Sequence, residues 1–262
     1  MQKLPKALLL AGFMGLTSGL ALAQTAPAPA PAEPPPSDHS FTGKVALYSE
    51  YEYRGISQTS EKPALQLNLD YAHASGFYIG TFLTNIKWLD DAANVGGFDT
   101  DARVEWDIYL GFKKEIAKDL TLDVGYLRYE YPNSSEFNPK PNTDEIYAGL
   151  TWQFLNVKYS HSINNTFGVP NSKNSYFIET NIAYPIEAVK GLTVTGHLGY
   201  QEFKNNDSLS YMVWKIGAVY DFGNGFNVGG YFKGTDAEEA LYTYKGKDWS
   251  KERLVAFVSY SF

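Results

Sequence analysis

The sequence contains no cysteine, only 19% charged residues and, beyond its N-terminus, no long apolar run. Without cysteine there is neither a disulfide framework nor a thiolate metal site. A membrane-spanning helix needs about 18 or more consecutive apolar residues, and residues 24–262 contain no such run. The net charge of −7 gives no basic excess for a phosphate backbone. Nucleic acid is therefore excluded as a partner, and a helical membrane protein as a class.

Aromatic residues and glycine are abundant instead. The chain has 20 Tyr, 16 Phe, 5 Trp and 23 Gly among its 262 residues. Aromatic side chains favour strands and glycine favours turns. The composition therefore predicts a β-rich protein.

The N-terminus predicts export from the cytoplasm. Lys3 and Lys6 precede a short apolar core at residues 8–20, and Ala21-Leu22-Ala23 forms a cleavage site. Residues 1–23 are thus expected to be a signal peptide, rather than an anchor, because the core is short and no stop-transfer charges follow. The Pro/Ala-rich residues 24–40 are expected to be a periplasmic linker.

From residue 41 onward, apolar and polar residues alternate with a period of two. Residues 103–113 are the clearest case, because successive side chains of a strand point to opposite faces. One face of this segment is apolar and the other is mostly polar: Val104, Trp106, Ile108, Leu110 and Phe112 against Arg103, Glu105, Asp107, Tyr109, Gly111 and Lys113. A helix would scatter these charges over its whole surface.

Twelve segments read as strands. They are approximately residues 41–55, 63–73, 77–88, 102–113, 120–131, 143–153, 155–163, 175–185, 191–203, 209–222, 226–234 and 253–262. Short turns alternate with longer polar connections, as in an outer-membrane barrel, whose strands need about 9–11 residues to cross. Residues 41–262 therefore predict an all-β, transmembrane antiparallel β-barrel of about 12 strands. A secreted sandwich is the alternative.

Aromatic residues near the strand ends predict two girdles at the membrane surfaces. One girdle is expected at the short turns, from Tyr71, Phe77, Phe112, Tyr184, Tyr220, Phe222 and Phe226. The other is expected near the long connections, from Tyr51, Tyr53, Trp88, Tyr129, Tyr131 and Tyr200. The last strand ends in Phe262, which resembles the C-terminal signal read by the outer-membrane assembly machinery.

Two segments carry a family resemblance. Residues 51–58, Tyr-Glu-Tyr-Arg-Gly-Ile-Ser-Gln, with Pro63-Ala64-Leu65-Gln66 after them, resemble the N-terminal signature of the TorF-family porins. Residues 70–80 resemble it too, although Phe82 and Thr84 stand where Trp and Ser are expected. The resemblance implies a proteobacterial outer-membrane barrel, but it implies no substrate and no catalytic residue.

Charged residues on the polar faces are expected to line a lumen, since a charge facing lipid is costly. The candidate pore-lining residues are Glu50, Glu52, Arg54, Asp70, Arg103, Glu105, Asp107, Glu145, Lys158, Glu179 and Lys233. On the long-connection side of the barrel, strand ends included, thirteen acidic side chains stand against seven basic ones. This excess would concentrate cations at the outer mouth.

The sequence predicts no catalytic, cofactor or metal site. His73 and Ser75 have the spacing of a base and a nucleophile, but their segment, His-Ala-Ser-Gly, reads as a tight turn at the periplasmic end. Asp90, Asp91, Asp99 and Asp101 form an acidic loop without the spacing of a calcium-binding loop.

The sequence thus predicts an integral outer-membrane channel for passive diffusion of small polar solutes or ions. Its expected partners are outer-membrane lipids, lipopolysaccharide and, through Phe262, the assembly machinery. Two alternatives stay open: a non-conducting structural or adhesive barrel, and an outer-membrane lipid hydrolase using His73 and Ser75.

Overall fold

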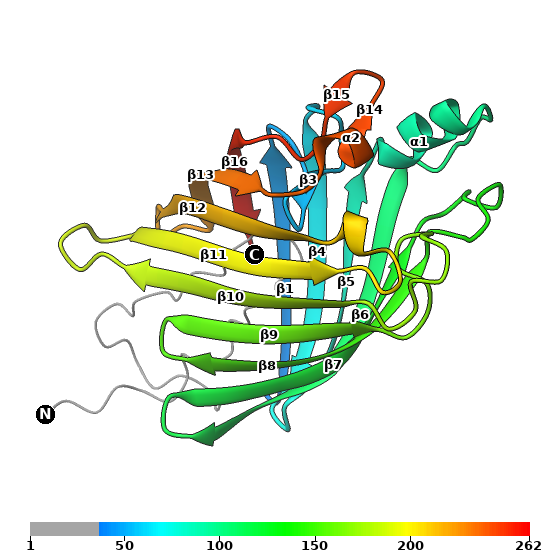
Figure 1. Cartoon of the computed structure of the whole chain (residues 1–262). Coiled ribbons are helices and arrows are strands. Elements are labelled where there is room, and N and C mark those ends of the chain that lie inside the picture. Colours follow the sequence, from blue (N-terminus) through cyan, green and yellow to red (C-terminus); the bar gives the residue numbers. More distant parts are fainter. Residues whose placement is uncertain (1–36) are drawn as a thin grey trace, which may run out of the picture.

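A computed structural model describes residues 37–262, which form one closed antiparallel barrel (Figure 1). Each barrel strand pairs with the next barrel strand along the chain, and β1 pairs with β16 to close the ring. The twelve barrel strands are β1 (His39–Tyr48), β4 (Ala64–His73), β5 (Phe77–Asn85), β6 (Val104–Ala117), β7 (Leu120–Glu130), β8 (Thr143–Trp152), β9 (Leu155–Ser162), β10 (Tyr176–Pro185), β11 (Leu192–Glu202), β12 (Tyr211–Asp221), β13 (Phe226–Thr235) and β16 (Arg253–Ser261).

The predicted fold class and strand number are confirmed, with one correction. The expected first strand, residues 41–55, ends early, at Tyr48. Beyond it the chain leaves the wall and forms a separate hairpin from β2 (Glu52–Tyr53) and β3 (Ile56–Ser57). The expected signal peptide and residues 24–36 lie outside the described residues, and β1 begins within the range assigned to the linker.

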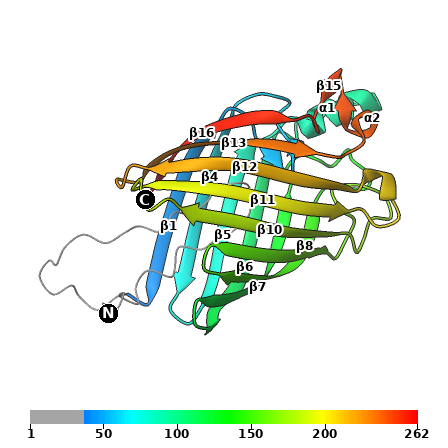
Figure 2. The same ribbon diagram turned by 60° about the vertical axis from the view of Figure 1, so that its left-hand side comes forward.

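The two ends of the barrel differ in their connections (Figure 2). Short turns join the strands at the end where β1 starts and Phe262 lies. Longer connections at the opposite end carry α1 (Trp88–Gly96), a 3-10 turn (Asp207–Leu209), α2 (Glu239–Tyr242), β14 (Thr243–Tyr244) and β15 (Lys247–Asp248). None of the helices in residues 37–262 has the length and apolarity to cross a membrane.

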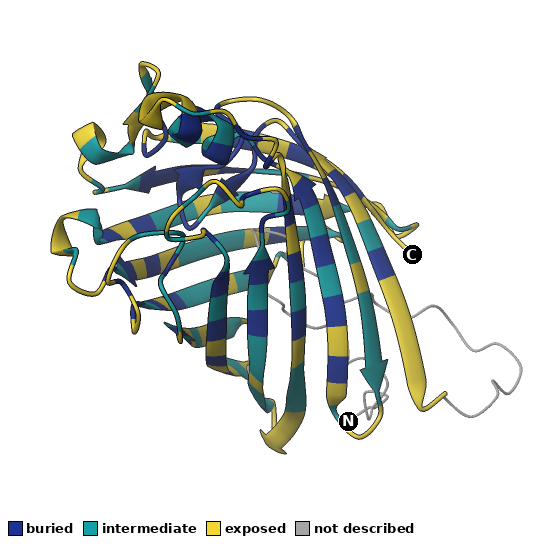
Figure 3. Cartoon of the chain, turned by 90° about the vertical axis from the view of Figure 1, so that its right-hand side faces the viewer, coloured by how far each residue is buried: buried dark blue, intermediate teal, exposed yellow. Residues whose placement is uncertain are grey.

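The apolar side chains of the strands face outward. On β6, Val104, Trp106 and Leu110 are exposed, whereas Glu105 and Asp107 between them are buried. Figure 3 shows this alternation along neighbouring strands. A barrel dissolved in water would bury its apolar face, so this arrangement suits a barrel surrounded by lipid.

Aromatic residues form the expected girdle at the short-turn end only. Phe77, Tyr184, Phe222 and Phe226 are exposed there, and the Phe77 and Phe112 rings pack edge to face with centroids 5.1 Å apart.

The expected girdle at the other end is wrong for most of its members. Tyr51, Tyr129 and Tyr131 are buried inside the barrel, and only Tyr200 of that set is exposed. The rings of Tyr159, Tyr176 and Tyr200 follow one another on the outer surface instead, with centroids 5.5 and 6.2 Å apart.

Candidate functional site: a charged hairpin inside the barrel

The connection between β1 and β4 folds into the barrel. We call residues 50–60 the inner hairpin; all of them except the partly exposed Tyr53 are buried. Its turn places Arg54 at φ 47° and Gly55 at φ 84°. Two positive φ angles define the tight turn that suits a two-residue hairpin. Glycine adopts this conformation freely, whereas Arg54 holds it at a cost of order 1–3 kcal/mol, which its contacts must offset.

Glycine is also required at position 55 by space. A Cβ atom there would lie 2.6 Å from side-chain carbons of both Val213 and Thr235. The Arg-Gly pair of the sequence signature therefore fits both the turn and the wall around it.

The Arg54 guanidinium binds one side of the barrel. Its two terminal nitrogens donate to the Glu145 carboxylate at 3.1 and 2.8 Å, and one of them also donates to Gln201 Oε1 at 2.7 Å. The guanidinium carbon lies 4.4 Å from the centroid of the Phe177 ring. A buried, bidentate pair of this kind combines charge with fixed geometry.

The hairpin carboxylates bind basic residues of two further strands. Glu52 pairs with Lys215 of β12 and also accepts from the Gly55 amide at 2.7 Å. Glu50 pairs with Arg253 of β16 at 2.8 Å. The hairpin therefore crosses the lumen from β8, bound by Arg54, to β16, bound by Glu50, while Glu52 binds β12 beside the strand of Gln201.

Lys233 of β13 fixes the hairpin turn. Its Nζ donates to the Gly55 carbonyl at 2.8 Å and has two longer contacts, of 3.4 Å each, with the carbonyls of Trp249 and Ser250. The side chain is fully buried. Lys233 thus contacts both the hairpin and the connection that leads into β16.

Inward charges are separated by sign around the ring. The acidic groups on β4 to β8 are Asp70, Glu105, Asp107, Asp123 and Glu145, and the basic groups on β9 to β1 are Lys158, Lys215, Lys233, Arg253 and Lys44. Lys113, Glu179 and Asp221 are exceptions. Two walls of opposite charge create a field across the lumen, and the charges of the inner hairpin are aligned with it.

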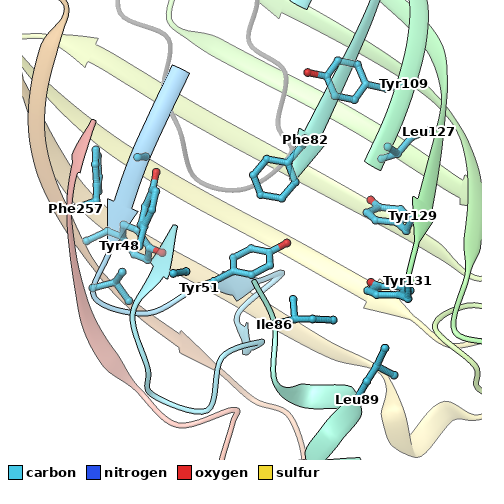
Figure 4. Packing of buried hydrophobic residues seen from close by; sticks show 14 of the residues in the cluster. Tyr48, Tyr51, Phe82, Ile86, Leu89, Tyr109, Leu127, Tyr129, Tyr131 and Phe257 are labelled. Atoms are coloured by element: carbon cyan, nitrogen blue, oxygen red, sulfur yellow. The ribbon is translucent and has the colours of Figure 1, made fainter. Parts of the chain in front are cut away.

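Tyrosine hydroxyls donate hydrogen bonds to the carboxylates of the acidic wall, with the exception of Asp107. Tyr51 of the hairpin donates to Glu105 Oε1 at 2.5 Å, and Tyr131 donates to Glu105 Oε2 at 3.0 Å. Figure 4 shows Tyr51 pointing across the interior, opposite the wall residues Tyr129 and Tyr131. Deeper in the barrel, Tyr109 donates to Asp70 at 2.6 Å. Hydrogen bonds of this kind are what buried carboxylates require.

Most predicted pore-lining residues lie inside the barrel, but in different settings. Glu50, Glu52 and Arg54 lie on the inner hairpin rather than on a strand of the barrel wall, because the period of two continues past Tyr48 while the backbone turns inward. Asp70, Glu105, Asp107, Glu145, Lys158, Glu179 and Lys233 belong to the wall. Arg103 is exposed and lies in the connection before β6 rather than on a wall strand.

Asp107 is buried without a partner. Neither of its carboxylate oxygens has a hydrogen bond among the described residues, whereas Lys158 lies over the Tyr147 ring at 4.1 Å and Glu179 accepts from Asn181 at 3.0 Å. The sequence did not single out Gln201 or Phe177, because a lone amide and a lone ring on a strand carry no signal of their own.

The outer connections cover the hairpin through Asp91 of α1. Asp91 accepts from Lys87 at 2.6 Å and from Ser60 of the inner hairpin, and it lies 3.4 Å from Lys245 of the last long connection. Burial opposes ionisation of the Asp91 carboxyl, but the hydrogen bonds from Lys87 and Ser60 outweigh it and lower its pKa. Three connections therefore meet at one carboxylate.

The structure gives no support for hydrolysis. Ser75 Oγ lies 2.7 Å from His73 Nδ1, but the same nitrogen also accepts the Ser75 amide at 3.1 Å, as in an ordinary turn. No acidic residue contacts the ring among the described interactions. In residues 37–262, no cluster of three or more His, Cys, Asp or Glu residues could hold a metal ion.

A model of a bacterial protein family, Gcw_chp, matches residues 32–262. The chain belongs to the Gcw_chp family. Its description is "bacterial protein of unknown function", so the family supplies no activity. No curated protein matches.

Two solved structures similar to this Gcw_chp protein are porins. A KdgM porin in complex with disordered oligogalacturonate is 11% identical, with 85% of this chain and 98% of that chain covered and a TM-score of 0.52. The NanC porin is 11% identical, with coverages of 85% and 99% and a TM-score of 0.51. At this identity the likeness shows the fold alone, a 12-stranded, porin-like barrel.

Proposed function

We propose that this Gcw_chp protein is an integral bacterial outer-membrane channel for passive diffusion of small polar solutes or ions, and not an enzyme. The observation that carries the proposal is the closed barrel with apolar side chains outside and charged side chains of both signs inside. An interior of paired charges and tyrosines favours polar solutes, because a solute without polar groups would leave them unsatisfied. We carry over no polyanionic substrate, since the inward cations Arg54, Lys215 and Arg253 already pair with carboxylates.

The second candidate is a non-conducting barrel that presents its outer connections to lipopolysaccharide or a partner. The inner hairpin favours it, because residues 50–60 contact opposite walls and occupy the lumen near its outer end.

Conductance in a planar bilayer tests both candidates. Wild type is compared with a variant in which a short turn replaces residues 49–63, which keeps β1 and β4 paired. Discrete current steps in wild type, larger in the variant, support the channel. Current in the variant alone supports the closed, non-conducting barrel, and no current in either would contradict the channel proposal.

The hydrolase alternative has its own variant. Ser75→Ala should leave the rate of phospholipid hydrolysis by the purified protein at the level of wild type. Loss of a measurable phospholipase activity in this variant, with the barrel intact, would restore the enzyme hypothesis.

A further inference from the structure

The residues that bind the Arg54 guanidinium, by hydrogen bonds or a ring contact, all belong to the barrel wall. Glu145 comes from β8, Phe177 from β10 and Gln201 from β11. We call these three residues the wall site. None of them depends on the inner hairpin for its place in the sheet, since their strands pair only within the ring.

Other wall residues hold the three side chains in position. Ser162 Oγ and the Tyr129 hydroxyl donate to Glu145, each at 3.3 Å. The Gln201 amide nitrogen donates to the Tyr176 and Glu202 carbonyls at 3.2 and 3.0 Å, which turns its oxygen toward the guanidinium.

Glycine makes room for the aromatic member of the wall site. A Cβ atom at Gly199 would lie 2.4 Å from the Phe177 ring. The wall thus presents a carboxylate, an amide oxygen and an aromatic face, which together match a planar cation.

The inner hairpin is separable from the barrel. Strands β2 and β3 pair only with each other, and the ring is complete without them. A two-stranded hairpin is marginally stable on its own in water. Its position therefore depends on the three ion pairs of Arg54, Glu52 and Glu50. It also depends on backbone hydrogen bonds to the outer connections, from the Ser57 amide to the Trp249 carbonyl and from the Lys87 and Trp88 amides to the Gln58 carbonyl.

The hairpin occupies the lumen as a dipolar solute would. Its cation pairs with Glu145 of the acidic wall and also contacts Phe177 and Gln201 of β10 and β11. Its carboxylates pair with Lys215 and Arg253 of the basic wall. A free molecule with a guanidinium group and a carboxylate carries the same two charges.

We propose that the wall site binds the guanidinium of a solute that also carries a carboxylate, and that Arg54 with Glu52 is an internal ligand which this solute displaces. The inference rests on the proposed channel function and names a substrate class for it. An intramolecular occupant and a free solute compete for one site, so the solute shifts the hairpin out only by its own affinity for the vacated wall.

The absence of cysteine permits a direct test. Ser57→Cys places one thiol on the fully buried part of the inner hairpin, and Ser75→Cys places one on the exposed turn as a matched control. The rate of maleimide labelling of the refolded full-length protein then reports hairpin displacement. The probes are L-arginine, L-citrulline, in which an uncharged group replaces the guanidinium, and agmatine, which lacks the carboxylate.

Arginine at about 100 mM should raise the Ser57→Cys labelling rate roughly threefold, because the internal ligand acts at an effective concentration of millimolar or above. Citrulline should have no effect, agmatine should have a smaller one, and Ser75→Cys should label at one rate throughout. Adding Glu145→Gln should raise the basal rate and abolish the response to arginine.

Equal labelling of Ser57→Cys with and without arginine, or an equal response to citrulline, would overturn the inference. If Ser57→Cys does not fold, Thr59→Cys on the same buried segment replaces it. Labelling does not require conduction, so a negative bilayer result with a positive arginine response would contradict the channel and leave the wall site standing.

Discussion

Arg54 and Glu145 are 91 positions apart in the chain, yet their side chains form a two-pronged ion pair inside the barrel. The pair joins the inner hairpin to the acidic wall, while Glu52 and Glu50 join it to the basic wall. The position of the hairpin therefore depends on charges contributed by opposite sides of the ring.

Removing one member of this pair should be worse than removing both. Glu145→Gln leaves the buried guanidinium without a countercharge, and breaking a buried pair costs about 3–5 kcal/mol. Arg54→Gly with Glu145→Gln removes both charges and relieves the strained backbone angle. We expect the hairpin of the single variant to be cleaved faster by protease than that of wild type, and the double variant to recover part of the protection. A double variant as sensitive as the sum of its single variants would show that the two side chains do not interact.

Heating should change the migration of the purified protein in detergent gels. A closed ring has no free edge strand, so it resists unfolding by detergent until it is boiled. We expect unheated and boiled samples to run at different apparent masses. The same migration in both, with a far-ultraviolet spectrum that lacks strand signal, would contradict the barrel.

Deleting Phe262 should impair assembly more than Phe262→Tyr does. The Phe262 amide donates to the Gly43 carbonyl at 2.9 Å, and the Gly43 amide donates back to Phe262 at 2.8 Å, so the last residue closes the seam between β1 and β16. Tyrosine keeps these backbone bonds and the ring, and deletion removes both. Fractionation of cells measures the outer-membrane content of each variant, and normal content of the deletion variant would exclude such a role.

The channel should prefer cations weakly, and less so as salt increases. The long connections, with the inner hairpin left out, carry twelve acidic and nine basic side chains, which leave a negative mouth. These charges are mostly exposed, and screening acts beyond about 10 Å at 0.1 M salt. The reversal potential under a KCl gradient measures the preference. Clear anion selectivity would instead indicate that inward bases control the narrowest part.

Low pH should weaken the contacts by which Asp91 joins the outer connections to the inner hairpin. Because its pKa is lowered in the folded protein, its contribution to stability is present above the ordinary value of about 3.9 and is lost as pH falls through the folded value. Hydrogen exchange in α1 should therefore be slower in wild type than in Asp91→Asn at pH near 6. The difference between the two proteins should shrink as the pH is lowered below the ordinary value, and a difference that stays constant as the pH falls would exclude this carboxylate as the cause.

The sequence predicts the strands of the ring well because a strand with an apolar outer face and a polar inner face must alternate apolar and polar residues. Eleven of the twelve predicted strands match the structure closely, and the exception is instructive. Apolar and polar residues still alternate after Tyr48, so the period of two cannot distinguish a wall strand from a hairpin that folds inward.

The same limit explains the wrong aromatic girdle. Tyr129 and Tyr131 lie near the end of a strand, where rings often contact lipid headgroups, but their hydroxyls bind carboxylates and the hairpin. Only the three-dimensional arrangement shows which carboxylates need donors. The wall site escaped prediction for the same reason, since Gln201 and Phe177 gain meaning only beside Arg54.

The pairing of β1 with β4 continues from His39 opposite His73 to Tyr48 opposite Ala64, with no rung contributed by the residues between them. The width of the ring is therefore set independently of what occupies it. Substitutions in the segment between Tyr48 and Ala64 can therefore change what fills the lumen without changing the pairing of the wall strands. For engineering, the segment between Tyr48 and Ala64 is a cassette into which other peptides could be placed.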